Sequence, residues 1–165
     1  MELQLIKHKD ILFKDILRAV AIKSIAWPFP LESQIKWIVD NMQDEDQHVF
    51  LKEGDTDCAY MTLSHVSGLM NGVPTSFMGV GCVCSATTGQ GFGKLLIVNI
   101  NKFLFDNNQR GLLFCKENLL NFYGKYDWRL IPFENVHFEK PYENVFTMTY
   151  NVKDIQRLDY ADRFF

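Results

Sequence analysis

The sequence from Val83 to Leu96 reads VCSATTGQGFGKLL, and the rest of the chain is best interpreted outward from it. It ends a β-rich run, passes through a glycine-rich loop at 87–93 and enters a strongly apolar segment typical of a helix. Such a loop at a helix N-terminus directs several backbone N–H groups toward one point, where the helix dipole adds about half a positive charge. The stretch therefore predicts an anion site, and phosphate or pyrophosphate is the usual occupant.

Two common phosphate-binding loops do not fit this stretch. A P-loop has the pattern GxxxxGK followed by Ser or Thr, but here Thr88 stands at the first glycine and Leu95 at the hydroxyl position. A Rossmann loop has the pattern GxGxxG early in a βαβ unit, but Lys94 stands at its third glycine and several predicted strands come first. Both patterns are excluded.

Two helices are predicted near the N-terminus. Apolar residues recur at helical spacing between residues 11 and 21, and Pro28 and Pro30 end that helix. A second helix is predicted from Leu31 to Met42. We expect its buried face to consist of Ile35, Ile38 and Val39.

An antiparallel meander is predicted between these helices and the loop. Strand-rich runs occupy 48–52 and 58–67, and Asn71-Gly72, a favoured type I′ hairpin pair, separates 66–70 from 73–78. The second strand continues through 80–84. The segment 58–93 holds no Asp, Glu, Lys or Arg, yet its Gly, Ser, Thr and Asn residues exclude a spanning helix. It predicts the centre of a sheet and a loop that faces an anion.

The elements after the loop complete the predicted fold. A helix is expected at 94–105, a buried strand at 111–115, a short helix at 119–125 and a late strand at 145–152. The element order predicts an α+β (mixed α/β) fold with a partly antiparallel sheet. A chain of 165 residues without an internal linker is expected to form one domain over 1–165.

Composition excludes several function classes. The net charge of −3 gives no basic excess for nucleic-acid phosphates, and the first ten residues lack the apolar stretch of a signal peptide. Four cysteines are too few for a disulfide framework, so reduced thiols in the cytoplasm are expected, with no membrane association. Cys82 and Cys84 have no second pair at ligand spacing. We therefore expect no metal and treat these thiols as small buried apolar groups.

The stretch 83–96 resembles motif A of the GCN5-related N-acetyltransferases, the GNAT superfamily. That motif is written as Arg or Gln, two residues, Gly, one residue, and Gly or Ala. Gly91 and Gly93 occupy its two small positions. Thr88 stands where Arg or Gln is usual, so the backbone amides and the threonine hydroxyl are left to contact a pyrophosphate.

A second segment resembles motif B of the same superfamily. The strand Gly111–Cys115 is followed by Phe122-Tyr123, a basic residue and an aromatic residue, where the usual form is a strand and a helix carrying Phe-Tyr. Asp127 replaces the usual glycine. The two motifs occur in the expected order and together cover about residues 77–131.

The resemblance implies a mostly antiparallel central sheet with two splayed parallel strands, here Met78–Cys84 and Gly111–Cys115, flanked by helices. It implies acetyl-CoA as the cofactor, with pantetheine paired to the amides of Cys82, Val83 and Cys84. The pyrophosphate is expected on the loop and helix N-terminus, and Asn118 is expected to reach the pantetheine or the pyrophosphate. The implied pyrophosphate residues are Thr88, Gly89, Gln90, Gly91, Phe92, Gly93 and Lys94.

Tyr123 matches the motif B tyrosine and is the expected catalytic residue. A phenol is protonated at neutral pH and can donate a proton to the departing CoA thiolate. Its alternative role is that of an aromatic anchor beside Phe122. No general base is assigned, because His65 stands alone in an uncharged strand, where a hydrogen-bonded structural histidine is the more common case.

The leading function is therefore acetyl transfer from acetyl-CoA to the primary amine of a small molecule or peptide. The alternative is a non-catalytic acyl-CoA-binding regulatory module, and transfer of a longer acyl chain is a third option. Residues of the variable regions could line the acceptor site or form core: Trp27, Phe29, Trp37, Phe133 and Tyr142. The tail 154–165 is expected to dock on the body or on a second subunit, as in a homodimer.

Overall fold

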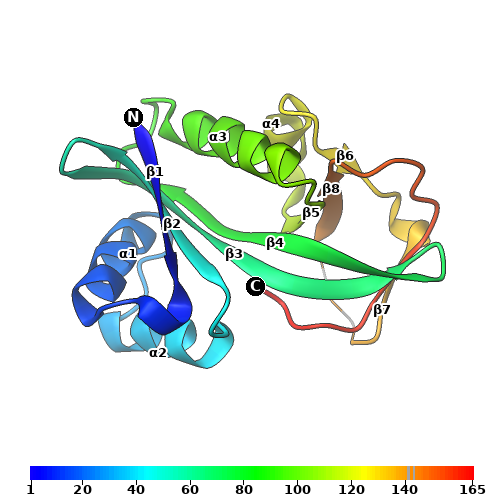
Figure 1. The fold of residues 1–165 in the computed structure, drawn as a ribbon, viewed down its shortest axis with the longest axis horizontal. Helices are drawn as coiled ribbons and strands as arrows, with labels where there is room; N and C mark the ends of the chain where they lie inside the picture. The colour runs from blue at the N-terminus through cyan, green and yellow to red at the C-terminus, as the bar shows by residue number, and fades with distance from the viewer. Residues whose placement is uncertain (141, 143) are drawn as a thin grey trace. The chain divides into compact units, whose positions relative to one another are not determined.

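The computed structural model describes residues 1–140, 142 and 144–165. They group into two compact units (Figure 1). The first contains residues 1–64, 81–99 and 165, and the second contains residues 65–80 and 100–164. The hydrogen-bonded strand order is β1-β2-β3-β4-β5-β8-β6, and β9 pairs with both β3 and β7. The sheet is mostly antiparallel, with β4 and β5 as a parallel pair, so the predicted α+β class is confirmed.

In the first unit, antiparallel strands pack against two helices. β1 (Glu2–Lys7) pairs along its whole length with β2 (Gln47–Glu53), which pairs with the start of β3 (Thr56–Met70). A 3-10 turn, η1 (His8–Asp10), leads into α1 (Phe13–Ala26) and α2 (Leu31–Asn41). The core contains the following residues: Ile16, Ala19, Val20, Ile22, Ile38, Met42, Phe50, Tyr60 and Cys84.

The two N-terminal helices lie where the sequence predicts them, with one error. The side-chain amide of Gln34 donates to the carbonyl oxygens of Trp27, at 2.9 Å, and Phe29, at 3.3 Å, which fixes the proline-containing connection. Ile38 is fully buried, but Val39 is 56% exposed, so the prediction that Val39 belongs to the buried face is wrong. The amphipathic stripe is narrower than the run of apolar residues suggested.

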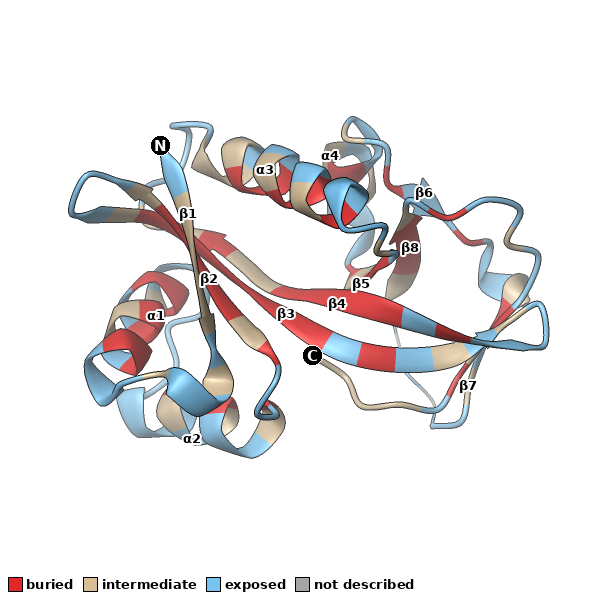
Figure 2. Ribbon diagram, viewed as in Figure 1, coloured by how far each residue is buried: buried red, intermediate tan, exposed pale blue. Residues whose placement is uncertain are grey.

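The uncharged segment forms the long strands β3 and β4 (Val73–Ser85), as predicted. All residues from Cys58 to Ser64 are buried, whereas from His65 onward exposed residues alternate with buried or half-buried ones along β3 (Figure 2). Asn71 and Gly72 have φ values of 52° and 80°, as a type I′ turn requires. After β4 comes α3 (Phe92–Asp106).

In the second unit, β5 (Gly111–Cys115) runs parallel to β4 over the pairs Met78–Gly111 and Gly79–Leu112, and antiparallel to β8 (Phe146–Tyr150). Between them lie η2 (Glu117–Leu119), α4 (Leu120–Gly124), β6 (Arg129–Leu130), η3 (Phe133–Asn135) and β7 (Val136–Phe138). A Cβ on Gly111 would lie 2.6 Å from the ring of Trp128, so only glycine permits this contact.

The C-terminal tail docks on the body of the chain. Its strand β9 (Leu158–Tyr160) pairs antiparallel with β3 and parallel with β7, and Phe164 stacks on the ring of Tyr142. This confirms one of the two predicted destinations of the tail. The single domain and the homodimer stay predictions. No helix in the described part of the chain is long and apolar enough to cross a membrane.

Candidate functional site

The glycine-rich loop of the first unit presents an open helix N-terminus. The first helical hydrogen bond of α3 runs from the Leu95 amide to the Gly91 carbonyl oxygen, at 3.0 Å. The amides of Phe92, Gly93 and Lys94 precede this bond and therefore have no helical acceptor. Together with the dipole of α3, they form a site that can bind an anion.

Two glycines give this loop its shape. Gly89 and Gly91 have φ values of +78° and +76°, a conformation that side chains disfavour, and a Cβ on either would find no atom within 4 Å. The glycines are thus required by backbone conformation and not by packing, and the space in front of them is open. Thr88 and Gln90 are exposed on the same loop.

The preceding end of β4 is irregular at Cys82. This residue has φ of +52° inside a strand, in the left-handed region that residues of a regular strand do not adopt. Cys82 and Val83 are half-buried, and Cys84 is buried with its thiol donating to the Tyr60 carbonyl oxygen at 3.6 Å. The three residues predicted to pair with pantetheine therefore lie at a distortion of the strand.

The cysteines of this region are uncharged thiols. Burial raises the pKa of Cys84 to about 12 and raises that of Cys82, although Lys23 and Thr62 oppose the shift at Cys82. All four cysteines are free. Among the described residues no group of three or more His, Cys, Asp and Glu side chains could hold a metal ion. These pKa shifts support the view that the thiols are small apolar groups.

Sequence reasoning missed a buried polar chain beside this strand. His8 Nδ1 and His48 Nε2 are 3.0 Å apart, and His48 Nδ1 is 2.8 Å from the Tyr60 hydroxyl. Burial lowers the pKa of His48 to about 3, so its imidazole is neutral at physiological pH. The signal for this polar chain is His48 at the start of the predicted strand 48–52, whereas His65, the histidine discussed above as a base, is exposed.

In the second unit, Tyr123 lies on α4 among aromatic rings. Its ring centroid is 5.1 Å from that of Phe122 and 6.2 Å from that of Trp128. Its side chain is buried, and its hydroxyl has no hydrogen-bond partner in the part of the chain that the structure describes. Burial raises the pKa of this phenol well above its usual value, and the nearby Cys115 thiol acts in the same direction. The hydroxyl is thus protonated and available to donate a hydrogen bond or a proton to a ligand.

Hydrogen bonds with Asn101 fix the turn that follows Tyr123 and carries Trp128. The Asn101 side chain on α3 donates to the Tyr126 carbonyl oxygen at 2.7 Å and accepts from the Trp128 indole N–H at 2.9 Å. Asp127, between them, has φ of +65°. The residue that replaces the glycine of motif B therefore adopts the backbone conformation for which glycine is preferred.

The predicted site residues fall into two groups, each within its own unit. The loop and the end of β4 belong to the first unit, and Tyr123 and Asn118 belong to the second. Asn118 is exposed on η2, where it lines a cavity of about 1110 Å³.

The aromatic residues of the variable regions also belong to different units. Phe133 and Tyr142 line that cavity, whereas Trp37 covers the ammonium of the buried Lys23 at 4.2 Å.

No known family profile matches the chain, and no curated protein matches its sequence. Solved structures do resemble it. An acyl-CoA N-acyltransferase from Pseudomonas aeruginosa has a TM-score of 0.63 at 14% identity, with 91% of this chain and 99% of that chain covered. An acetyltransferase from Streptococcus agalactiae has a TM-score of 0.60 at 10% identity, covering 90% and 97%.

A GCN5-related N-acetyltransferase from Kribbella flavida also matches, with a TM-score of 0.54 at 14% identity. This match covers 79% of the present chain and 33% of the longer one. At such identities, the likeness shows a shared fold.

Proposed function

From the GNAT fold that this chain has, we propose that it is an acetyl-CoA-dependent N-acetyltransferase that acts on a primary amine of a small molecule or peptide. The observation that carries the proposal is the open N-terminus of α3, with Gly89 and Gly91 in left-handed conformations before it. Its amides suit the negative charge of a pyrophosphate, and a Cβ on Gly89 or Gly91 would meet no atom within 4 Å, so the approach to the amides is open.

Acetyl-CoA supplies the acetyl group as an activated thioester. In the proposed reaction the ammonium of the acceptor first loses a proton to solvent water, and the neutral amine then forms the new C–N bond while the C–S bond breaks. The nitrogen loses a second proton to water, from which the proton donor is restored, and the sulfur receives a proton. The Tyr123 hydroxyl, protonated and without a hydrogen-bond partner among the described residues, holds that proton. The raised pKa keeps the phenol protonated but also makes it a weaker acid, so its contribution is expected near the lower end of the general-acid range.

The first test is acetyl-CoA binding. Gly91→Val should abolish measurable calorimetric binding, because a β-branched residue cannot easily adopt φ of +76° and its side chain would enter the anion site. The open space around position 91 lets the variant stay folded. Gly54→Val is the matched control, since Gly54 also has positive φ, +58°, and open surroundings but lies in the turn before β3. Equal affinity of wild type and Gly91→Val would refute the loop assignment.

A second test separates enzyme from binding module. The alternative is favoured by Thr88, which is exposed where motif A carries Arg or Gln. Tyr123→Phe keeps the ring contacts and removes the proton donor. We expect kcat to fall by about 100-fold, with the Kd for acetyl-CoA unchanged. Phe122→Leu is the control for lost ring packing. If wild type binds acetyl-CoA but releases no thiol with any amine of a broad panel, the binding module becomes the better description.

A further inference from the structure

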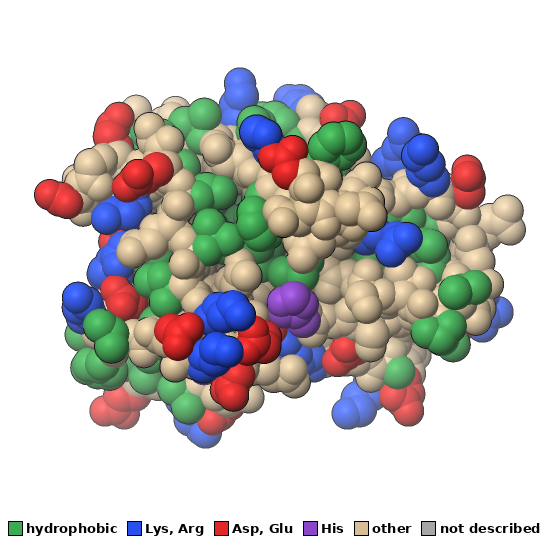
Figure 3. All heavy atoms as spheres, viewed as in Figure 1, with side chains coloured by type: hydrophobic (Ala, Val, Ile, Leu, Met, Phe, Trp, Pro, Cys, Tyr) green, Lys and Arg blue, Asp and Glu red, His purple; other side chains and the backbone are tan. Residues whose placement is uncertain are grey.

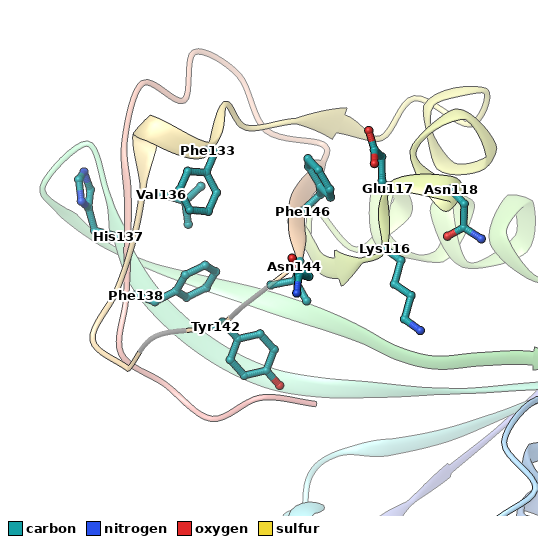
Figure 4. Close-up of a pocket in the computed structure, with 11 residues that line it drawn as sticks. Lys116, Glu117, Asn118, Phe133, Val136, His137, Phe138, Tyr142, Asn144 and Phe146 are labelled. Atoms are coloured by element: carbon teal, nitrogen blue, oxygen red, sulfur yellow. The ribbon is translucent and has the colours of Figure 1, made fainter.

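A large cavity in the second unit is not used by the loop or by the proposed proton donor. Its volume is about 1110 Å³, slightly above the range of about 300–1,000 Å³ that is typical of small-molecule sites. The end of β5 with η2 forms one side, and η3, β7 and the start of β8 form the other (Figure 4). All residues that line it belong to this unit.

The wall formed by η3, β7 and β8 is apolar and rich in rings. Phe133, Val136, Phe138 and Phe146 line it. Phe138 is held in place by neighbouring rings, with its centroid 5.6 Å from that of Phe114. Phe133, in contrast, is 70% exposed and has no ring partner among the described residues. An exposed ring beside a fixed one offers two faces to a flat apolar ligand.

The opposite end of the cavity is polar. Lys116, Glu117 and Asn118 follow β5 directly, and their side chains form no hydrogen bond or ion pair within the described residues. In Figure 4 the Glu117 carboxylate and the Lys116 ammonium point in opposite directions. At this end η2 packs against α4, the helix that carries Tyr123. The polar end of the cavity is therefore near the proposed donor.

The described charges at the polar end suit a ligand with one cationic group. Glu117 is the one carboxylate among the described lining residues, and Lys116 stands next to it. A polyamine or an aminoglycoside carries several cationic groups and needs several carboxylates. A single ammonium attached to an apolar body needs one carboxylate and an apolar wall.

We propose that this cavity binds the acceptor, and that the acceptor is a small amine with an aromatic ring, its ammonium paired with Glu117 and its ring between Phe133 and Phe138. The identification of the ligand as an acceptor rests on the proposed function. Binding of the amine itself does not.

Calorimetric titration of 2-phenylethylamine into the free protein tests the cavity without any turnover. Phe133→Ser and Glu117→Gln should each raise the Kd about tenfold, through the lost ring contact and the lost charge respectively. Phe105→Ser is the control for the first, because Phe105 is 65% exposed on α3 and does not line the cavity. Glu134→Gln, an exposed carboxylate outside the lining, is the control for the second.

The same amine, spermidine and a lysine-containing peptide are then compared as acceptors with acetyl-CoA. We expect the highest kcat/KM for 2-phenylethylamine. Phe133→Ser should lower this kcat/KM and leave the KM for acetyl-CoA unchanged. It is overturned if wild type fails to bind 2-phenylethylamine, if Phe133→Ser and Phe105→Ser bind it equally, or if spermidine or the peptide is the better acceptor. Amine binding without thiol release would support the cavity and count against the acetyltransferase.

Discussion

Asp127 shows how a departure from a family pattern can be tolerated at a single residue. The usual motif B glycine allows a left-handed backbone, and Asp127 adopts that conformation with φ of +65°. Asp and Asn enter this region at lower cost than most residues with a Cβ. The turn after α4 therefore has a backbone conformation that glycine would also adopt, and the rings of Trp128 and Tyr123 lie 6.2 Å apart, centroid to centroid.

This conformation leads to a stability prediction. Asp127→Gly should change the free energy of unfolding little, whereas Asp127→Val should lower it by about 1–2 kcal/mol, because a β-branched residue is strained at positive φ. Urea denaturation measures both. Lys125→Val is the control, since Lys125 is exposed with an ordinary φ of −67°. A loss at position 127 no larger than that at 125 would show that the backbone conformation is not the cause.

At the scale of elements, the sequence predicted the turns and helix ends that are determined by neighbouring residues. The prolines that end α1, the Asn71-Gly72 turn and the glycine-rich loop before α3 each act through residues next to one another, and the structure has all of them. The strand Gly111–Cys115 has the predicted bounds. The loop that forms one half of the candidate site is predictable from the sequence for the same reason.

The elements that the sequence did not reveal depend on distant partners. β6, β7 and β9 are two or three residues long, too short to carry a periodic pattern, and each is defined by its pairing. β1 is longer, and polar and apolar residues alternate from Glu2 to Leu5, so a strand signal is present there and was not used in the sequence analysis. The cavity was missed because η2, η3, β7 and β8 each supply only a few of its residues.

At the scale of the whole molecule, three elements contribute residues to both compact units. β3, β4 and α3 each cross from one unit to the other, so neither unit is a continuous piece of chain. Cutting the chain at any one position therefore cannot release either unit intact. The free energy of unfolding should therefore be measured on the full chain. The pH dependence of this free energy is set by groups whose pKa changes on folding.

His48 is the group expected to dominate this dependence in mild acid. Burial lowers its pKa to about 3, with the charges of His8 and Lys23 acting in the same direction and those of Asp46 and Asp15 opposing them. In the unfolded chain a histidine has a pKa of about 6.5. Between these values the unfolded chain binds a proton that the folded chain does not. The free energy of unfolding must therefore fall as the pH falls.

The expected slope from this one site approaches about 1.4 kcal/mol per pH unit once the unfolded imidazole is fully protonated. Burial also lowers the pKa of His8, which adds to the slope with the same sign. His48→Gln should therefore flatten the decline in stability between about pH 6 and about pH 5, even though losing the contact with Tyr60 lowers stability at every pH. Urea unfolding at several pH values measures the slope, and His137→Gln, at an exposed histidine, is the control. An unchanged slope in His48→Gln would mean that the buried imidazole takes up its proton without unfolding of the chain.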